Sequence, residues 1–94
     1  MKVRFTPNAL ADLDEVLTYI GERSGQGGAR TKHRLLEVIA PLRRFPRMGT
    51  PTDMPNIRVL VATPYPYLVF YEYAEGSNDV VIQHIRHGRR EREI

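Results

Sequence analysis

Three apolar runs separated by short turn-like segments fill most of the chain after residue 57 and constrain the fold more than any other feature. The runs are "IRVLVA" (57–62), "YLVFYEY" (67–73) and the stretch that begins with "VVI" at Val80. They are rich in β-branched and aromatic residues, which favour strands, and proline or glycine lies in each connecting segment. Strands joined by such short turns pair antiparallel. The sequence therefore predicts a three-stranded antiparallel meander.

The first part of the chain predicts a strand and then a helix. "KVRF" (2–5) alternates polar and apolar residues, and Thr6 and Pro7 then provide a helix cap and a first helical residue. The apolar residues that follow recur at helical spacing: Leu10, Leu13, Val16, Leu17 and Ile20. The acidic residues between them, Asp12 included, are expected to face water.

A glycine-rich turn is predicted between this helix and a second one. The three glycines of "SGQGG" (24–28) favour a tight reversal, so the second helix, from about Ala29 to Phe45, should run antiparallel to the first. Pro41 has no backbone donor and is expected to kink or tighten the last turn of that helix. The proline-rich segment 45–56 predicts a surface loop.

Together these elements predict a two-layer α+β fold in a single domain, residues 1–94. The N-terminal strand, the antiparallel helical hairpin and the meander would give one four-stranded sheet with helices on one face, which leaves the other face open to a partner. The chain has no cysteine, which fits a reducing cytoplasm, and no apolar run near the ~20 residues of a membrane span. Three scattered histidines form no metal-binding pattern. We expect a cytoplasmic protein without metal or cofactor.

Arginine dominates the basic residues and concentrates near the C-terminus. Lys and Arg number 14 against 11 acidic residues, and only Lys2 and Lys32 are lysine. Arginine favours forked contacts with phosphate and carboxylate groups. The densest basic run follows the last predicted strand: Arg86, His87, Arg89, Arg90 and Arg92. Such a run either forms a solvated tail or meets an anionic partner.

Four segments, in their order along the chain, resemble the ParE/RelE toxin superfamily of bacterial type II toxin–antitoxin systems. They are "FTPNALADLDEVLTYI", "LRRFPRMG", "IRVLVATPYPYLVFYEY" and "IQHIRHGRR". The resemblance implies a four-stranded antiparallel sheet with the first strand beside the last. It also implies an antitoxin that wraps the toxin and blocks it, in a hetero-oligomer.

The superfamily contains two activities. ParE-like members poison DNA gyrase without catalysis and are neutralised by ParD-like antitoxins, whereas RelE-like members cut mRNA in the ribosome. RNA cleavage requires groups that activate the 2′-hydroxyl, hold the phosphate and protonate the leaving oxygen. The lysine pair and the late tyrosine of RelE-like members have no counterpart here, and the "HGRR" ending is similar to ParE-like members. The resemblance therefore implies a gyrase inhibitor that arrests growth. A ribosome-dependent endoribonuclease and a non-toxic basic binding module are the alternatives.

The target-binding residues implied by this resemblance are Arg58, Arg86, His87, Arg89 and Arg90. In the endoribonuclease alternative, Arg58 and Arg86 would hold the phosphate, and His84 or His87 would act as acid or base. Arg86 and His87 point to opposite faces of a regular strand. A bulge near Gln83 would change which residues share each face.

Overall fold

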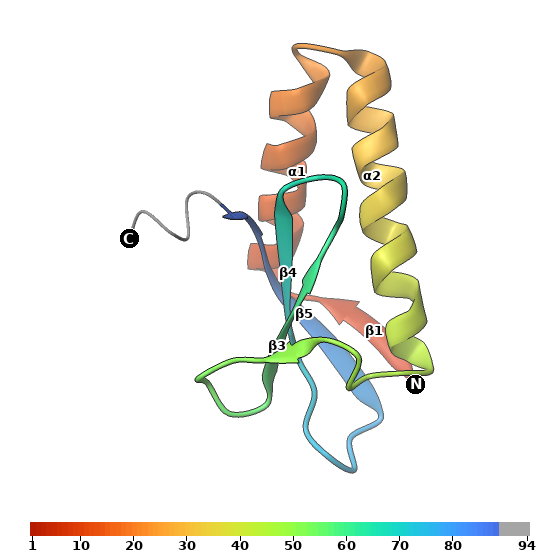
Figure 1. Cartoon of the computed structure of the whole chain (residues 1–94), viewed down its shortest axis with the longest axis vertical. Helices are drawn as coiled ribbons and strands as arrows, with labels where there is room; N and C mark the ends of the chain where they lie inside the picture. Colours follow the sequence, from red (N-terminus) through yellow and green to blue (C-terminus); the bar gives the residue numbers. More distant parts are fainter. Residues whose placement is uncertain (89–94) are drawn as a thin grey trace.

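The computed structural model describes residues 1–88, which form one sheet backed by a helical hairpin (Figure 1). The sheet has five strands in the order β1-β5-β4-β3-β2. Their bounds are β1 (Lys2–Phe5), β2 (Thr50–Pro51), β3 (Ile57–Val61), β4 (Tyr67–Glu72) and β5 (Asp79–His87). Neighbouring strands of β3, β4 and β5 pair antiparallel, so the predicted meander is confirmed.

The two edges of the sheet differ from the prediction. β1 lies beside β5, but the pair is parallel. The two strands are joined through almost the whole chain and not by a hairpin, so nothing forces them antiparallel. The fifth strand, β2, lies within the predicted loop 45–56, where Thr50 pairs with Val59 and Pro51 pairs with Arg58. The prediction of four strands is therefore corrected to five.

The helices begin where side chains cap them. α1 (Pro7–Gly21) starts as predicted, because the Thr6 hydroxyl accepts a hydrogen bond from the N–H of Ala9. α2 (Gly25–Ile39) starts earlier than predicted, because the Ser24 hydroxyl accepts a hydrogen bond from the N–H of Gly27 at 3.0 Å. The glycines predicted to form the turn thus lie in the first turn of α2, and the reversal is complete before them.

The end of the second helix tightens, as its proline predicted. α2 gives way at Ile39 to η1 (Ala40–Arg43), a 3-10 helix that contains Pro41. Proline cannot donate to the carbonyl one turn earlier, so the α-helical ladder is interrupted there. The predicted helix end at Phe45 is replaced by this short turn.

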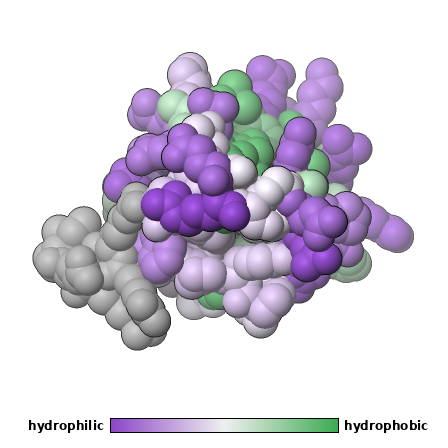
Figure 2. Space-filling view, turned by 90° about the horizontal axis from the view of Figure 1, so that it is seen from above, coloured by the Kyte–Doolittle hydropathy of each residue, from purple (hydrophilic) through white to green (hydrophobic). Residues whose placement is uncertain are grey.

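The core lies between the helices and one face of the sheet. The buried side chains alternate along β4 and β5 and meet those of α1, α2 and η1: Tyr67, Val69, Tyr71, Val80, Ile82, Ile85, Ala9, Leu35, Ile39 and Leu42. The α1–α2 hairpin extends past the sheet at the end where the helices join (Figure 1). Figure 2 looks down on that end, which is mostly hydrophilic. Within residues 1–88, no helix has the length and apolar character needed to span a membrane.

A buried tyrosine and an arginine hold the loop between η1 and β2. The hydroxyl of Tyr71 donates a hydrogen bond to the Pro46 carbonyl at 2.7 Å and accepts one from the N–H of Gly49 at 2.9 Å. Nη1 of Arg58 donates to the carbonyl of Arg47 at 3.0 Å and to that of Gly49 at 2.8 Å. These four bonds fix the loop backbone and bring Thr50 and Pro51 alongside β3.

The Tyr71 hydroxyl makes stability depend on pH. Burial raises the pKa of Tyr71 above its usual value of about 10, against smaller opposing effects of the Gly49 hydrogen bond and the Arg58 charge. Folding therefore favours the protonated phenol, so its contribution is fully present below about pH 10 and is lost as pH rises through the raised value. We expect Tyr71→Phe to flatten the decline in unfolding free energy above pH 10, measured by urea titration. An equally steep decline in the variant would contradict this.

Candidate functional site

The uncovered face of the sheet carries two cross-strand rows that combine apolar side chains with a base. One row is Val61, Leu68 and Arg86, and the other is Val59, Phe70 and His84. Residues directly opposite each other on paired strands share a face. The residues between them on β4 are buried beneath the helices, so both rows face away from the core. Val61 is 55% exposed. We call these six residues the open-face surface.

A β-bulge at Gln83 decides which side chains of β5 reach this face. Phe70 pairs with His84, but the next residue of β4 pairs with Ile82, so Gln83 has no opposite residue. The bulge considered from the sequence is therefore present. It places His84 on the uncovered face and turns His87 toward the helix-covered one.

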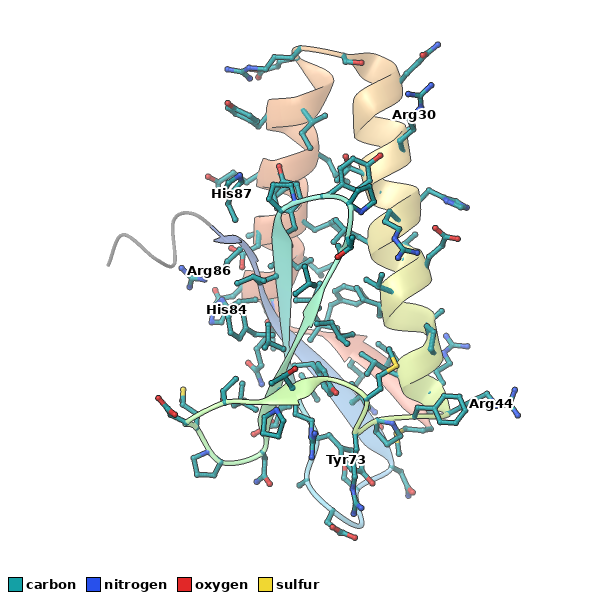
Figure 3. The ribbon with its side chains drawn as sticks, viewed as in Figure 1. Arg30, Arg44, Tyr73, His84, Arg86 and His87 are labelled. Carbon is teal, nitrogen blue, oxygen red and sulfur yellow. The ribbon has the colours of Figure 1, made fainter. Side chains whose placement is uncertain are left out.

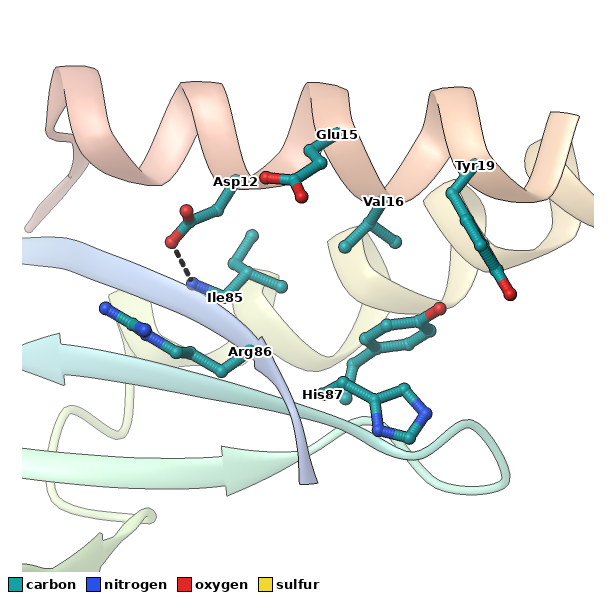
Figure 4. A pocket seen from close by; sticks show the side chains of 8 residues that line it. Asp12, Glu15, Val16, Tyr19, Ile85, Arg86 and His87 are labelled. Carbon is teal, nitrogen blue, oxygen red and sulfur yellow. Dashed lines mark hydrogen bonds between the residues drawn. The ribbon is translucent and has the colours of Figure 1, made fainter. Parts of the chain in front are cut away.

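Beside the open-face surface, α1 and the end of β5 enclose a cleft of about 500 Å³ (Figure 4). Its lining comes from α1, β4 and β5: Asp12, Glu15, Val16, Tyr19, Tyr67, Ile85, Arg86 and His87. The imidazole of His87 meets the ring of Tyr67 edge-on, with 5.5 Å between the centroids. The α1 side of the cleft carries Asp12 and Glu15, and the β5 side carries Arg86 and His87. The cleft therefore suits a ligand that has both positive and negative groups.

Asp12 connects α1 to the edge of β5. Its Oδ2 accepts a hydrogen bond from the N–H of Ile85 at 3.0 Å (Figure 4). β1 pairs with β5 only as far as Phe5 and Ile82, so the rest of β5 has no strand on that side, and the Asp12 carboxylate satisfies a backbone donor that no neighbouring strand pairs. The expectation that Asp12 faces water is therefore wrong.

His84 lies between a carboxylate and a guanidinium. Its Nδ1 is 3.4 Å from Oδ2 of Asp12 and 3.4 Å from Nη2 of Arg86. When Nδ1 carries the hydrogen and donates it to Asp12, Nε2 is left to accept a hydrogen bond or a proton. An oriented imidazole and a cation thus lie side by side at the end of the open-face surface, as the labels in Figure 3 show.

Arg58 is separated from this cluster. It pairs with Tyr71 and shares the face of that residue, whereas Arg86 pairs with Leu68 on the opposite face. Its guanidinium donates to two carbonyls of the loop before β2. Arg58 therefore holds this loop in place.

The other residues predicted for the site lie in different parts of the molecule. His84 and Arg86 lie together on the open face, and Arg86 also lines the cleft together with His87. Arg89 and Arg90 lie outside the described residues. The structure thus distributes the four residues of the endoribonuclease alternative over both faces of the sheet.

Sequence reasoning missed Asp12 and the apolar half of the open-face surface. A signal for the latter exists in β4, whose Leu68 and Phe70 alternate with buried residues and are themselves apolar. A two-layer fold buries only one face of its sheet, so a strand that is apolar on both faces indicates a partner on the second. The sequence gives no comparable signal for the strand-edge contact of Asp12.

Asp12→Ala is expected to lower the free energy of unfolding by about 1–2 kcal/mol, because the buried N–H of Ile85 loses its acceptor. Asp12→Asn keeps an oxygen acceptor and should lose less. Asp14→Ala, an exposed change on the same helix, should stay within about 0.5 kcal/mol of wild type. Urea unfolding measures all three. Equal losses in Asp12→Ala and Asp14→Ala would rule out the strand-edge role.

Known proteins resemble this chain over nearly its full length. Residues 3–92 match the family described as the ParE toxin of type II toxin–antitoxin system, parDE. The chain is 30% identical over 90 residues to the putative toxin Y4kP of Sinorhizobium fredii, covering 96% of this chain and 91% of that one. It is 36% identical over 89 residues to toxin RelE2 of Caulobacter vibrioides, covering 95% and 97%. A solved structure of the chromosomal ParDE TA system from P. aeruginosa shares the fold, with a TM-score of 0.81 at 21% identity over 93% of this chain and 95% of that one.

Proposed function

Because the chain belongs to the ParE toxin family of type II toxin–antitoxin systems, we propose that it inhibits DNA gyrase and that a ParD-like antitoxin keeps it inactive. The family makes it the toxin component of such a system, with an antitoxin as partner. The proposal adds that the target is gyrase and that the antitoxin is ParD-like. Both partners would meet the chain in the cytoplasm.

The open-face surface is the observation that carries the proposal. Four half-buried or exposed apolar side chains lie in register with His84 and Arg86 on a face that no helix covers. Apolar area with arginine beside it is typical of surfaces that bind proteins. A binding role needs no acid/base set, and the separation of Arg58 and His87 from this face supports binding over catalysis.

In this proposal each part of the surface has a role. The apolar rows exclude water and supply contact area against gyrase. Arg86 pairs with a carboxylate of gyrase or a phosphate of its DNA, and His84, oriented by Asp12, adds a hydrogen bond. His87 would contact the same target from the adjoining cleft, and we include Arg89 and Arg90, which lie outside the described residues, among the target-binding residues. No covalent bond in the target is broken by the toxin itself.

An endoribonuclease is the second candidate, and the contact between His84 and Asp12 is the observation that favours it. A carboxylate on one ring nitrogen orients imidazole for acid/base work at the other, and Arg86 beside it can hold a phosphate. This arrangement supplies one acid/base group on the open face. Cleavage also requires a second such group to protonate the leaving oxygen.

Expression in cells separates the two candidates. Induction without the antitoxin is expected to arrest growth and to leave broken chromosomal DNA with intact mRNA. Co-expression of the reading frame that accompanies the gene should restore growth. Cleaved mRNA with intact chromosomal DNA would instead favour the endoribonuclease, and normal growth without the antitoxin would contradict both.

A further inference from the structure

The outer face of the α1–α2 hairpin carries two exposed leucines. Leu10 on α1 is 53% exposed and Leu36 on α2 is 45% exposed. The sheet packs against the opposite side of the hairpin, so within residues 1–88 no strand covers this face (Figure 1). Large exposed apolar side chains that lie together mark interaction sites.

The two leucines lie level with each other on the hairpin. α1 and α2 each have 15 residues and run antiparallel from a short turn (Figure 1). Leu10 precedes the end of α1 by as many residues as Leu36 follows the start of α2, so both lie at about the same distance from the turn. The same count places Asp14 level with Lys32. We call these four residues the hairpin surface.

The hairpin surface borders the groove between the two helices. Gly28 of α2 lies against α1, where an added Cβ would be 3.6 Å from the carbonyl oxygen of Leu17. Lys32 follows Gly28 by one helical turn, and Leu10 precedes Leu17 by two turns, so both lie on the sides where the helices meet. The other two members of the hairpin surface lie one turn further along the same stripes, and all four side chains are exposed. They therefore lie together on the solvent side of the groove.

The two helices carry opposite charges. α1 contains carboxylates and no lysine or arginine, whereas α2 carries Arg30, Lys32 and Arg34 against Glu37. Among residues 1–88, neither Asp14 nor Lys32 forms an ion pair. The hairpin surface thus has an acidic half and a basic half, each with one exposed leucine. Each half is complementary in charge to the other.

We propose that the hairpin surface binds a second copy of the chain, so that α1 of each copy packs against α2 of the other. A two-fold axis parallel to the helices exchanges the two sides of the hairpin and keeps every level in place. Asp14 of each copy then meets Lys32 of the other, and the leucines of both copies meet beside them. An axis across the helices would instead place α1 against α1, where like charges repel. The interface is the same patch on both copies, so the assembly closes at a dimer.

The dimer goes beyond the proposed function, because it uses the side of the molecule opposite to the open-face surface. The hairpin lies between that surface and the second copy. Both open-face surfaces therefore remain exposed in the dimer, on its two outer sides.

Sedimentation equilibrium of the antitoxin-free chain measures the association. The interface is small and its ion pairs are exposed to solvent, so we expect a dissociation constant of about 10–100 μM. The average mass should rise from monomer toward dimer across this range and not beyond it. Added salt should shift the equilibrium toward monomer, because it screens the contacts between the helices. A monomer at every concentration, or growth into larger assemblies, would overturn the proposal.

Charge-reversal variants test the orientation of the two copies. Asp14→Lys makes both charged positions of the hairpin surface basic, and Lys32→Asp makes both acidic. Each variant alone should dimerise at least about tenfold more weakly than wild type. An equal mixture of the two should form a heterodimer about as tight as the wild-type dimer, because every contact then joins a lysine and an aspartate.

This rescue distinguishes a contact between copies from an effect within one chain. Both variants remain net positive, because the chain has a net charge of +3 and each reversal changes it by two. Attraction between oppositely charged molecules therefore does not account for association of the mixture. A mixture that stays monomeric would overturn the proposal.

Matched controls show whether the hairpin surface itself is the interface. Leu36→Ser should weaken dimerisation at least about tenfold, because each dimer loses two buried leucines. Met54→Ser removes a side chain that is 65% exposed outside the hairpin and should change the dissociation constant less than about twofold. Asp53→Lys, the same reversal as Asp14→Lys at an exposed position outside the helices, should also change it less than about twofold.

Equal losses in the controls would mean non-specific adhesion and would overturn the proposal. Leu10→Ser replaces Leu36→Ser if the latter alters the urea midpoint. Neither gyrase nor an antitoxin is present in these measurements, so their outcome is independent of the proposed function.

Discussion

Gly49→Ala is expected to lower the free energy of unfolding by about 3 kcal/mol. A Cβ at this position would lie 2.6 Å from the Tyr71 hydroxyl oxygen and 2.7 Å from its Cε1. The ring cannot move aside, because Tyr71 is fully buried and its hydroxyl is bonded to Pro46 and to Gly49 itself. The variant must therefore shift the loop or the core. Urea unfolding at neutral pH measures the loss.

Gly25→Ala provides the matched control for this prediction. It makes the same chemical change in the first turn of α2, where the added Cβ meets no atom within 4 Å. Alanine favours the helix over glycine, so the unfolding free energy should stay the same or rise by up to about 1 kcal/mol. If the two variants were equally stable, the close packing of Gly49 against Tyr71 would not limit the fold.

Arg86→Glu is expected to weaken binding to the toxin's target by at least about tenfold and to abolish growth arrest at expression levels where wild type arrests growth. Charge reversal places a carboxylate where the proposal needs a cation, beside the apolar row of Val61 and Leu68. Arg86 is exposed, so the folded state should be retained, and an unchanged urea midpoint checks this. Colony counts after induction measure the effect.

Arg30→Glu separates the local effect of Arg86 from the change in net charge. It makes the same substitution at an exposed position of α2, away from the open-face surface (Figure 3). Growth arrest should persist in this variant. Loss of toxicity in both variants would show that overall charge matters and that Arg86 has no specific role. Retained toxicity in both would remove the open-face surface from the mechanism.

Sequence patterns predicted the elements whose signals are local. The strand runs of the meander, the capped start of α1 and the tightening at Pro41 follow from residues within a few positions of each other. The start of α2 was misplaced because two local signals compete at "SGQGG": Ser24 acts as an N-cap, although the glycines alone favour a turn. The capping serine prevails because it satisfies the N–H of Gly27.

The features that escaped prediction depend on contacts between distant residues. β2 exists because Tyr71 and Arg58, which lie 22 and 9 positions from Gly49, bond the loop before it, and two residues such as Thr50 and Pro51 carry no strand signal. Asp12 lies 73 positions from the strand donor that it satisfies. The bulge at Gln83 was only a possibility in the sequence, because β5 is apolar on both faces. It decides that His84 and Arg86 lie on the open face and not on the helix-covered one.

DNA supercoiling by purified gyrase tests the central claim most directly. We predict that the antitoxin-free chain stops gyrase from supercoiling relaxed plasmid or makes it accumulate cleaved plasmid. Arg30→Glu should act at the same concentration, and Arg86→Glu should require at least about tenfold more. Complete supercoiling in the presence of a large excess of the wild-type chain, together with cleavage of mRNA in a translating extract, would contradict the account.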